Sequence, residues 1–290
     1  MAAQYNFMRS QLGRLLPGKR CPRSSQRSVH SSSSALRGGF PTAFFVWRSP
    51  RAVPTDFSKR HTPLPAPEFR PALAFTALTP WFDVVAKIAV RDEFLKRHLS
   101  ELFPLAPGQS VLDVGCGTGT LLLRLHEQQP AARLFGVDAD PNALALAERK
   151  GRQRMVNWSL LVASATQLPF PDNCFDGVVT SLVFHHLTTP QKQQALREIQ
   201  RVLRPGGRLL LADYDAPRTW LEHLAFLPVR LFDGFDATEA HVQGVLPTLL
   251  QAAGFTAVEV CAEIPTAFGY ITAWQARSPA HDGLTAVMMA

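Results

Sequence analysis

The stretch VLDVGCGTGT, residues 111–120, decides the fold. Its first half is a short apolar run typical of a buried strand, and its second half holds three glycines spaced two residues apart, Gly115, Gly117 and Gly119. An apolar pattern with helical spacing follows directly. Glycines between a strand and a helix let the backbone approach a ligand, and the first N–H groups of the helix favour an anion. The stretch therefore predicts a ligand-binding turn at the carboxyl end of a buried strand.

The segments on both sides of this stretch alternate between strand and helix patterns. Strand patterns lie at residues 110–115, 133–140, 158–164, 175–183, 208–214, 256–264 and 267–276. Helix patterns lie at residues 80–102, 118–129, 141–151, 189–207 and 241–255, the last three ending at Gly151, at Pro205–Gly207 and at Gly254. Such alternation is typical of a parallel sheet covered on both faces. We predict the α/β class, with a doubly wound, mostly parallel seven-stranded sheet and helices on both faces.

Composition divides the chain into three parts. Residues 1–75 are rich in Arg, Ser and Pro and are predicted to be a disordered leader and linker. Residues 76–277 are predicted to form the folded domain, and residues 278–290 a frayed tail. Inside the domain, the apolar segment near 216–245 interrupts the alternation. We expect this insertion either to cover a substrate or to pack as two helices on the sheet.

The excess positive charge is confined to the leader. The net charge is +7, but residues 1–62 hold 11 of the 30 Lys and Arg and only one acidic residue, Asp56, of 23. The rest of the chain is slightly acidic, so we expect no nucleic-acid partner. The leader resembles an organellar transit peptide, and a disordered extension or an upstream start codon also explains it. We expect a cytoplasmic protein, with a mitochondrial location as the alternative.

The cysteines and the hydropathy exclude other classes of protein. The four cysteines, Cys21, Cys116, Cys174 and Cys261, form neither a CxxC pair nor a cluster with His at metal-ligand spacing. We therefore predict no disulfide framework and no metal site. No uninterrupted apolar run reaches the roughly 18 residues that a spanning helix needs.

An acid at the end of the second predicted strand indicates which ligand the glycine turn binds. Asp138 lies 23 residues after Gly115, where a carboxylate accepts hydrogen bonds from ribose hydroxyls. Asp140 is expected to cap the helix that begins at Pro141. Thr120 occupies the position of the third glycine of the dinucleotide fingerprint, which disfavours a nicotinamide enzyme. The turn also lacks the Lys of a phosphoryl-transfer loop.

Five stretches, in order, resemble one known family. They are residues 111–119, GVDAD at 136–140, ASATQLPFPDNCFDGVVTS at 163–181, HHL at 185–187 and EIQRVLRPGGRLLLADY at 198–214. Together they resemble the class I S-adenosylmethionine-dependent methyltransferases, in the branch of the type 11 and ubiquinone/menaquinone-biosynthesis enzymes. The resemblance covers roughly residues 80–275. It implies a Rossmann-like methyltransferase fold with S-adenosyl-L-methionine as cofactor.

The resemblance also implies a role for the residues that follow the first four strands of the sheet. The amino-acid end of the cofactor would be held by Asp113 and the loop of Gly115, Cys116, Gly117, Thr118 and Gly119. Asp138, with Ala139 beside it, would hold the ribose. The adenine would lie beside Ser164, Ala165 and Thr166, and the methionine moiety beside Ser181 and Leu182. Many relatives have Asp in place of Ser164, so looser adenine contacts are implied, and Cys116 is expected to be a packing residue.

The implied reaction needs neither a metal nor a covalent nucleophile, because a sulfonium methyl group is already activated. A general base helps if the acceptor carries a proton, and His is the usual choice near neutral pH. His185 and His186 are the candidates, with a purely structural role as the alternative. His223 and His241 are weaker candidates. Asp213 and Tyr214 either face the acceptor or are ordinary polar residues at a strand end.

The apolar insertion favours a small apolar or aromatic acceptor, methylated by in-line displacement. Contact with a membrane surface and the oligomeric state stay open. Methylation of RNA or protein is one alternative, although the slightly acidic domain does not favour it. A methyltransferase-like protein that binds the cofactor without turnover is the other.

Overall fold

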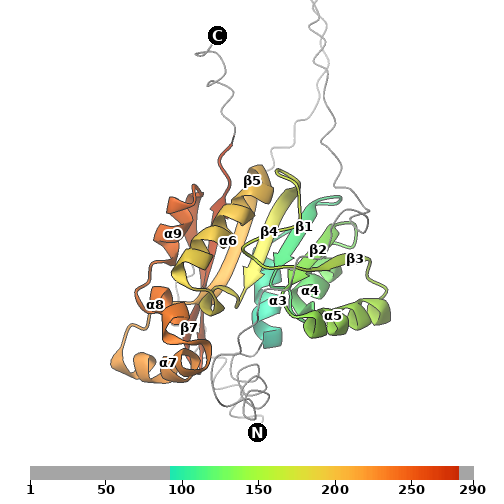
Figure 1. Ribbon diagram of the computed structural model, residues 1–290. Coiled ribbons are helices and arrows are strands. Elements are labelled where there is room, and N and C mark those ends of the chain that lie inside the picture. The colour runs from blue at the N-terminus through green and yellow to red at the C-terminus, as the bar shows by residue number, and fades with distance from the viewer. Residues whose placement is uncertain (1–91, 281–290) are drawn as a thin grey trace, which may run out of the picture. The chain divides into compact units, whose positions relative to one another are not determined.

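The computed structural model of the protein describes residues 92–280 (Figure 1). The helices are α3 (Asp92–Leu102), α4 (Thr120–Gln128), α5 (Pro141–Arg154), the short 3-10 helix η1 (Phe184–His186), α6 (Thr189–Val202), α7 (Trp220–Asp233), α8 (Phe235–Val242) and α9 (Leu246–Ala252). The strands are β1 (Ser110–Val114), β2 (Arg133–Asp138), β3 (Trp158–Val162), β4 (Phe175–Ser181), β5 (Leu203–Tyr214), β6 (Thr256–Thr266) and β7 (Gly269–Arg277). The predicted leader, the helix pattern before residue 92 and the tail after residue 280 lie outside the described residues.

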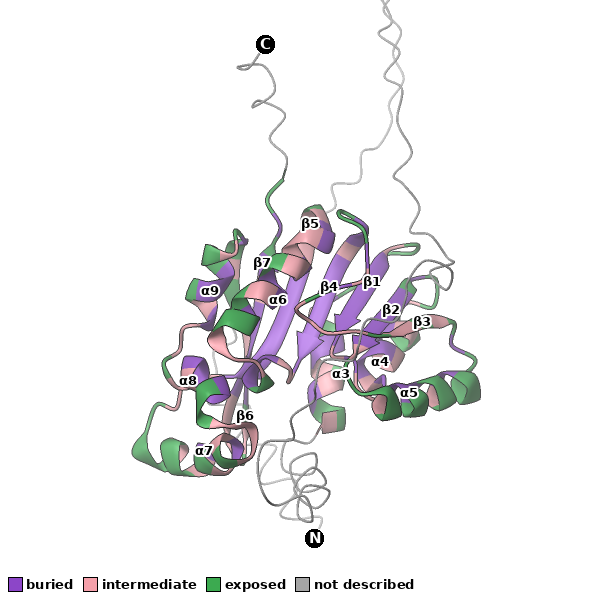
Figure 2. Cartoon of the chain, viewed as in Figure 1, coloured by how far each residue is buried: buried purple, intermediate pink, exposed green. Residues whose placement is uncertain are grey.

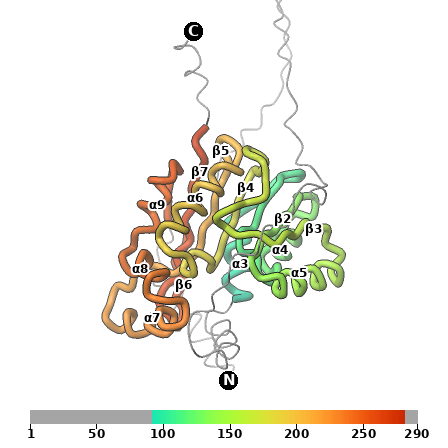
Figure 3. Tube along the Cα trace, viewed as in Figure 1, coloured from blue at the N-terminus to red at the C-terminus, as the bar shows by residue number. Residues whose placement is uncertain are grey.

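The strands form one seven-stranded sheet in the order β3-β2-β1-β4-β5-β7-β6. Strands β1 to β5 pair in parallel, and β7 is antiparallel to both of its neighbours. The predicted fold class is therefore confirmed. The strand order reverses between β1 and β4, which lie side by side although far apart in the chain (Figure 3). In an open α/β sheet, ligands bind beyond the carboxyl ends of the strands at such a point.

Alternate residues of the strands contribute to two apolar cores, one on each face of the sheet. The central strands are coloured as buried in Figure 2. In β1, Leu112 and Val114 pack with α6 and α9, whereas Val111 packs with α3 and α4. Because successive strand residues point to opposite faces, this division places helices on both faces, as predicted. Among the described residues, no helix is long and apolar enough to cross a membrane.

The predicted end of the helix pattern over 141–151 is wrong. Helix α5 continues past Gly151 to Arg154, and the residue that ends it is Met155, with a left-handed φ of 54°. Gly151 is instead a contact point, because a Cβ there would lie 2.6 Å from the indole of Trp158 on β3. The glycine therefore allows α5 to approach the sheet, and the sequence signal resembled that of a helix end.

Two other predicted helices are shorter than expected. Helix α6 ends at Val202, and residues 205–207 belong to β5, because Pro205 cannot continue a helix and Gly206 has a φ of 74°. The pattern over 241–255 is divided between the end of α8 and α9. Gly244, with a φ of 65°, lies in the break between them, and Gly254 follows α9 as predicted.

The close contact between Gly151 and Trp158 predicts that a larger side chain at residue 151 destabilises the fold. Gly151→Ala in α5 should lower the free energy of unfolding by about 1–3 kcal/mol, because the new methyl group overlaps a rigid indole ring. The same change in an open helix would stabilise by up to about 1 kcal/mol. Urea denaturation measures the difference, with Arg152→Ala, one residue along the helix and mostly exposed, as the control. A more stable Gly151→Ala variant would contradict the packing of α5 on Trp158.

Candidate active site

The glycine loop between β1 and α4 is held by backbone bonds and by the absence of side chains. Gly115, Gly117 and Gly119 have φ values of 74°, 52° and 73°, which residues with a Cβ rarely adopt. The N–H groups of Gly115 and Cys116 donate to the carbonyl of Val137 at 2.8 and 3.0 Å. A Cβ on Gly115 would lie only 2.1 Å from Val183 Cγ2. The loop thus lies tightly between the carboxyl ends of β2 and β4.

Asp138, at the end of β2, is tied directly to this loop. Its Oδ2 accepts from the N–H of Gly117 at 2.7 Å, and its Oδ1 accepts from the N–H of Asp140 at 2.9 Å. Each oxygen has a second lone pair that can accept from a ligand hydroxyl. Asp140 Oδ1 accepts from the N–H of Asn142 at 2.8 Å, so the predicted cap of α5 is confirmed. Ala139, between the two acids, is exposed.

Asp113 of β1 and Cys116 of the glycine loop are both buried. Asp113 is 1% exposed, and its Oδ1 has no hydrogen-bond partner. Burial raises the pKa of Asp113 to about 7, and the nearby Lys96 opposes part of that rise. Burial also raises the pKa of the Cys116 thiol, which keeps that side chain in its neutral form. Cys116 lies close to Gly136 of β2, as expected for a packing residue.

The predicted adenine residues follow β3 and are half-buried. The hydroxyls of Ser164 and Thr166 lie 2.8 Å apart, and the N–H of Thr166 donates to Ser164 Oγ at 3.2 Å. Ala165 packs against the apolar core. The Ser164 hydroxyl is therefore already hydrogen-bonded within its own turn. This agrees with the weaker adenine contact that the resemblance implies, because many relatives have Asp at this position.

The end of β4 has an unusual backbone. Ser181 is the last residue of the strand, and Leu182 follows with a φ of 58°. A branched side chain in this left-handed region is rare and is held only where the surroundings impose it. The N–H of Leu182 donates to the carbonyl of Ala212 on β5 at 2.9 Å. The Ser181 hydroxyl accepts a hydrogen bond from the ammonium group of Lys96 on α3.

The carboxylate of Asp213, at the end of β5, organises the loop after Leu182. Its Oδ2 accepts from the N–H groups of Val183, Phe184 and His185 at 3.1, 2.7 and 3.3 Å. Its Oδ1 accepts from the N–H of Tyr214 at 2.8 Å and lies 2.7 Å from His185 Nδ1. Burial alone would raise the pKa of Asp213, but the neighbouring His185 and His241 and the hydrogen bonds to its oxygens together outweigh burial and hold that pKa below its ordinary value.

These bonds fix the tautomer of His185. Because the Asp213 carboxylate is ionised and can only accept, His185 Nδ1 must be the donor between them. In the neutral ring, Nε2 then carries the free lone pair. Nε2 lies 3.8 Å from an oxygen of Asp233, the last residue of α7. The geometry therefore gives His185 the form that a general base requires.

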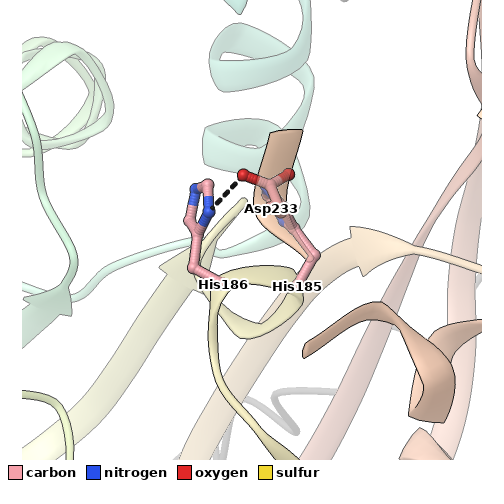
Figure 4. Close-up of side chains that lie close together, drawn as sticks. All are labelled: His185, His186 and Asp233. Carbon is pink, nitrogen blue, oxygen red and sulfur yellow. Dashed lines mark ion pairs between the residues drawn. The ribbon is translucent and has the colours of Figure 1, made fainter. Parts of the chain in front are cut away.

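His186 lies beside His185 but is more exposed (Figure 4). Its Nδ1 is 2.9 Å from Asp233 Oδ1, and its side chain is 56% exposed, compared with 8% for His185. One ligand atom each from His185, His186 and Asp233 lies within 4.8 Å of the others, so this triad could hold a metal ion. The sequence predicts no metal site, and Asp233, 47 residues beyond His186, forms no motif with it that could have indicated this triad.

The structure also places the weaker candidates. His241 is fully buried, its Nδ1 lies 2.7 Å from the carbonyl of Tyr214, and burial lowers its pKa. It is a neutral core residue. Tyr214 is buried as well, and burial raises its pKa. His223 is exposed on α7. Asp213 binds the backbone of the loop after β4, so it is neither a residue that simply faces the acceptor nor an ordinary polar residue at a strand end.

Two charged residues of the site were not predicted. Lys96 reaches it from α3, where the apolar spacing of the helix identified only the buried face. Asp233 reaches it from the end of the insertion. Neither residue belongs to a motif, and the only available signal was a charge beside an apolar helical face.

The comparisons with known proteins agree with this geometry. Residues 111–207 match the family model of a methyltransferase domain. A demethylmenaquinone methyltransferase of Thermus thermophilus is 35% identical over 49% of this chain and 65% of that protein, slightly less than two thirds of its length. An uncharacterised methyltransferase of Synechocystis is 35% identical over 62% of this chain and 84% of that protein.

A solved structure shows the same fold. A methyltransferase of Methanosarcina mazei, 22% identical, has a TM-score of 0.52 over 61% of this chain and 96% of that one. Together with the relative that is matched over most of its length, the glycine loop and the sheet order confirm the resemblance. The chain belongs to the S-adenosylmethionine-dependent methyltransferase family, whose cofactor is S-adenosylmethionine.

Proposed function

We propose that the protein transfers a methyl group to a small aromatic or apolar acceptor, with His185 as the general base. The observation that carries this proposal is the Asp213–His185 contact of 2.7 Å beyond the carboxyl ends of β4 and β5. It presents a buried imidazole in the right tautomer next to the strand end that the resemblance assigns to the methionine moiety.

The residues around the glycine loop fit S-adenosylmethionine. The Asp138 carboxylate has lone pairs for two ribose hydroxyls, and the unpartnered Oδ1 of Asp113 suits the α-ammonium group. The glycine loop and Thr118 would lie along the amino-acid end. Ser164, Ala165 and Thr166 would lie beside the adenine. Ser181 and Leu182 would line the methionine moiety.

When bound, the cofactor supplies a methyl group on a positively charged sulfur. The protein has to position the acceptor, exclude water and remove a proton. His185 Nε2 takes a proton from the acceptor, which raises the electron density on the attacking oxygen or ring carbon. The resulting imidazolium lies between the carboxylates of Asp213 and Asp233, and both stabilise its charge.

The exposed side of α7 supports an apolar acceptor. Trp220, Leu221, Leu224 and Leu231 are 73%, 57%, 59% and 56% exposed, whereas the helix buries Phe226 and Val229. Much of α7 is coloured as exposed in Figure 2. Such an apolar surface is typical of a binding site for apolar molecules. Because the Thermus relative is named for a quinone, we propose an aromatic ring with an apolar tail as the acceptor.

The assignment of the ribose site predicts a contrast between two neighbouring acids. Asp138→Ala should weaken S-adenosylmethionine binding by about 10-fold or more, because it removes charge-assisted acceptors. Asp140→Ala should leave the affinity nearly unchanged and cost about 1 kcal/mol of stability, because it removes only the cap. Titration calorimetry and thermal denaturation of both variants measure the two effects. Wild-type affinity in Asp138→Ala would mean that the ribose lies elsewhere.

The role of His185 predicts a second contrast. His185→Asn keeps a donor toward Asp213 but has no base, so kcat should fall by about 100-fold or more while cofactor affinity is kept. His186→Asn, the exposed neighbour, should lose far less. Single-turnover rates with methyl-labelled cofactor measure both. Equal losses in the two variants would reject His185 as the specific base.

Removal of metal ions distinguishes two roles of His185, as a general base or as a metal ligand together with His186 and Asp233. Dialysis against a chelator should leave the rate unchanged, because His185 Nε2 needs only its lone pair. Loss of activity that a divalent cation restores would assign the triad to a metal instead.

The exposed face of α7 predicts an effect on the acceptor alone. A Leu221→Gln/Leu224→Gln variant should raise KM for a long-tailed quinol by about 5- to 20-fold, because apolar contact is lost. KM for the same ring without its tail and cofactor affinity should not change, and Glu222→Gln on the same helix is the control. An unchanged KM for the long-tailed acceptor would reject α7 as its binding surface.

A further inference from the structure

Lys96 lies on the inner side of α3, and its ion pair among the described residues is a long one. Its side chain is only 12% exposed, and its ammonium group donates to the hydroxyl of Ser181 at the end of β4. The nearest ion pair is with Asp92 Oδ1, at 3.8 Å, one turn earlier on the same helix. A poorly solvated ammonium group is costly unless anions compensate for it, and these two contacts do so only in part.

The charge of Lys96 lies within electrostatic reach of Asp113. Lys96 contacts Ser181 at the carboxyl end of β4, and β4 pairs with β1 through Asp113–Val179, so both charged groups lie at the same end of the sheet. The charge of Lys96 also lowers the pKa of Asp113, against the larger effect of burial. Asp113 Oδ1, buried and without a hydrogen-bond partner, is an acceptor for a cation. The site thus offers one cation and, when a bound cation holds the Asp113 carboxyl ionised, one anion beside the glycine loop.

A zwitterionic ligand matches this pair of charges. An α-amino acid carries an ammonium and a carboxylate group on one carbon atom, so each group can pair with its opposite and the charge of the site stays balanced. A pyrophosphate would instead bring two negative charges toward Asp113 and Asp138. The charges of the site therefore disfavour a dinucleotide, and this argument does not depend on the spacing of the glycines.

We propose that Lys96 binds the α-carboxylate of S-adenosylmethionine while Asp113 binds its α-ammonium group, which together clamp the zwitterionic end of the cofactor. This inference rests on the proposed function, because it concerns the same cofactor site. Lys96 would exchange its contact with a neutral hydroxyl for a charge-assisted bond, which is roughly twice as strong. Helix α3 thereby becomes part of the cofactor site, although it precedes all the family motifs.

The competing explanation is that Lys96 only balances the charge of Asp113. A pair of ligands distinguishes the two explanations, because decarboxylated S-adenosylmethionine keeps the ammonium, the sulfonium and the adenosine but lacks the α-carboxylate. Titration calorimetry of the full chain with both ligands gives four affinities for the wild type and Lys96→Met. Arg97→Met, on the exposed side of α3, is the matched control.

The wild type and the control should prefer S-adenosylmethionine to the decarboxylated ligand by about 10- to 100-fold. Lys96→Met should bind the two ligands within about threefold of each other, because the preference depends on the ammonium. Asp113→Asn should weaken both ligands alike. If Lys96→Met does not fold, Lys96→Arg keeps the charge and should keep the preference.

A Lys96→Met variant that keeps the wild-type preference would overturn the clamp, and so would a wild type that binds both ligands equally. These results leave the proposed function intact, because the cofactor still binds. Failure of the wild type to bind either ligand would overturn the proposed function itself, and the clamp with it.

Discussion

The carboxylate of Asp213 is the group on which the arrangement at the carboxyl edge of the sheet depends. It accepts hydrogen bonds from the backbone N–H groups of residues 183, 184, 185 and 214 and contacts the ring of His185. A buried carboxylate is stable only when its oxygens are satisfied, and these bonds satisfy both. One side chain therefore fixes the path of the loop after β4 and the tautomer of its histidine.

The effect of this carboxylate extends to the glycine loop. The loop after β4 places Val183 where a side chain on Gly115 would otherwise lie, so the turn after β1 can be occupied only by glycine at that position. The same path forces the left-handed backbone at Leu182. The glycine loop and His185 are thus positioned by contacts among the ends of β1, β4 and β5, next to the point between β1 and β4 where the strand order reverses.

The sequence predicted the elements whose signals are local. The mostly parallel sheet, the glycine turn after β1 and the cap at Asp140 follow from apolar spacing, glycine and proline positions and an acid before Pro141. The helix end at Gly151 failed because a glycine that accommodates Trp158 resembles one that ends a helix. Lys96 and Asp233 were missed because their contacts form only when α3 and α7 pack against distant strand ends. The sequence of a helix does not indicate which distant residues its side chains will contact.

We propose that Asp213 holds His185 as a base with a free Nε2. Long-range proton–nitrogen correlation spectra, assigned with the His185→Asn variant, read the protonation of each ring nitrogen directly at a pH where the ring is neutral. We expect a proton on Nδ1 and none on Nε2. A His185 ring that carries its proton on Nε2, with Nδ1 bare toward Asp213, would contradict it.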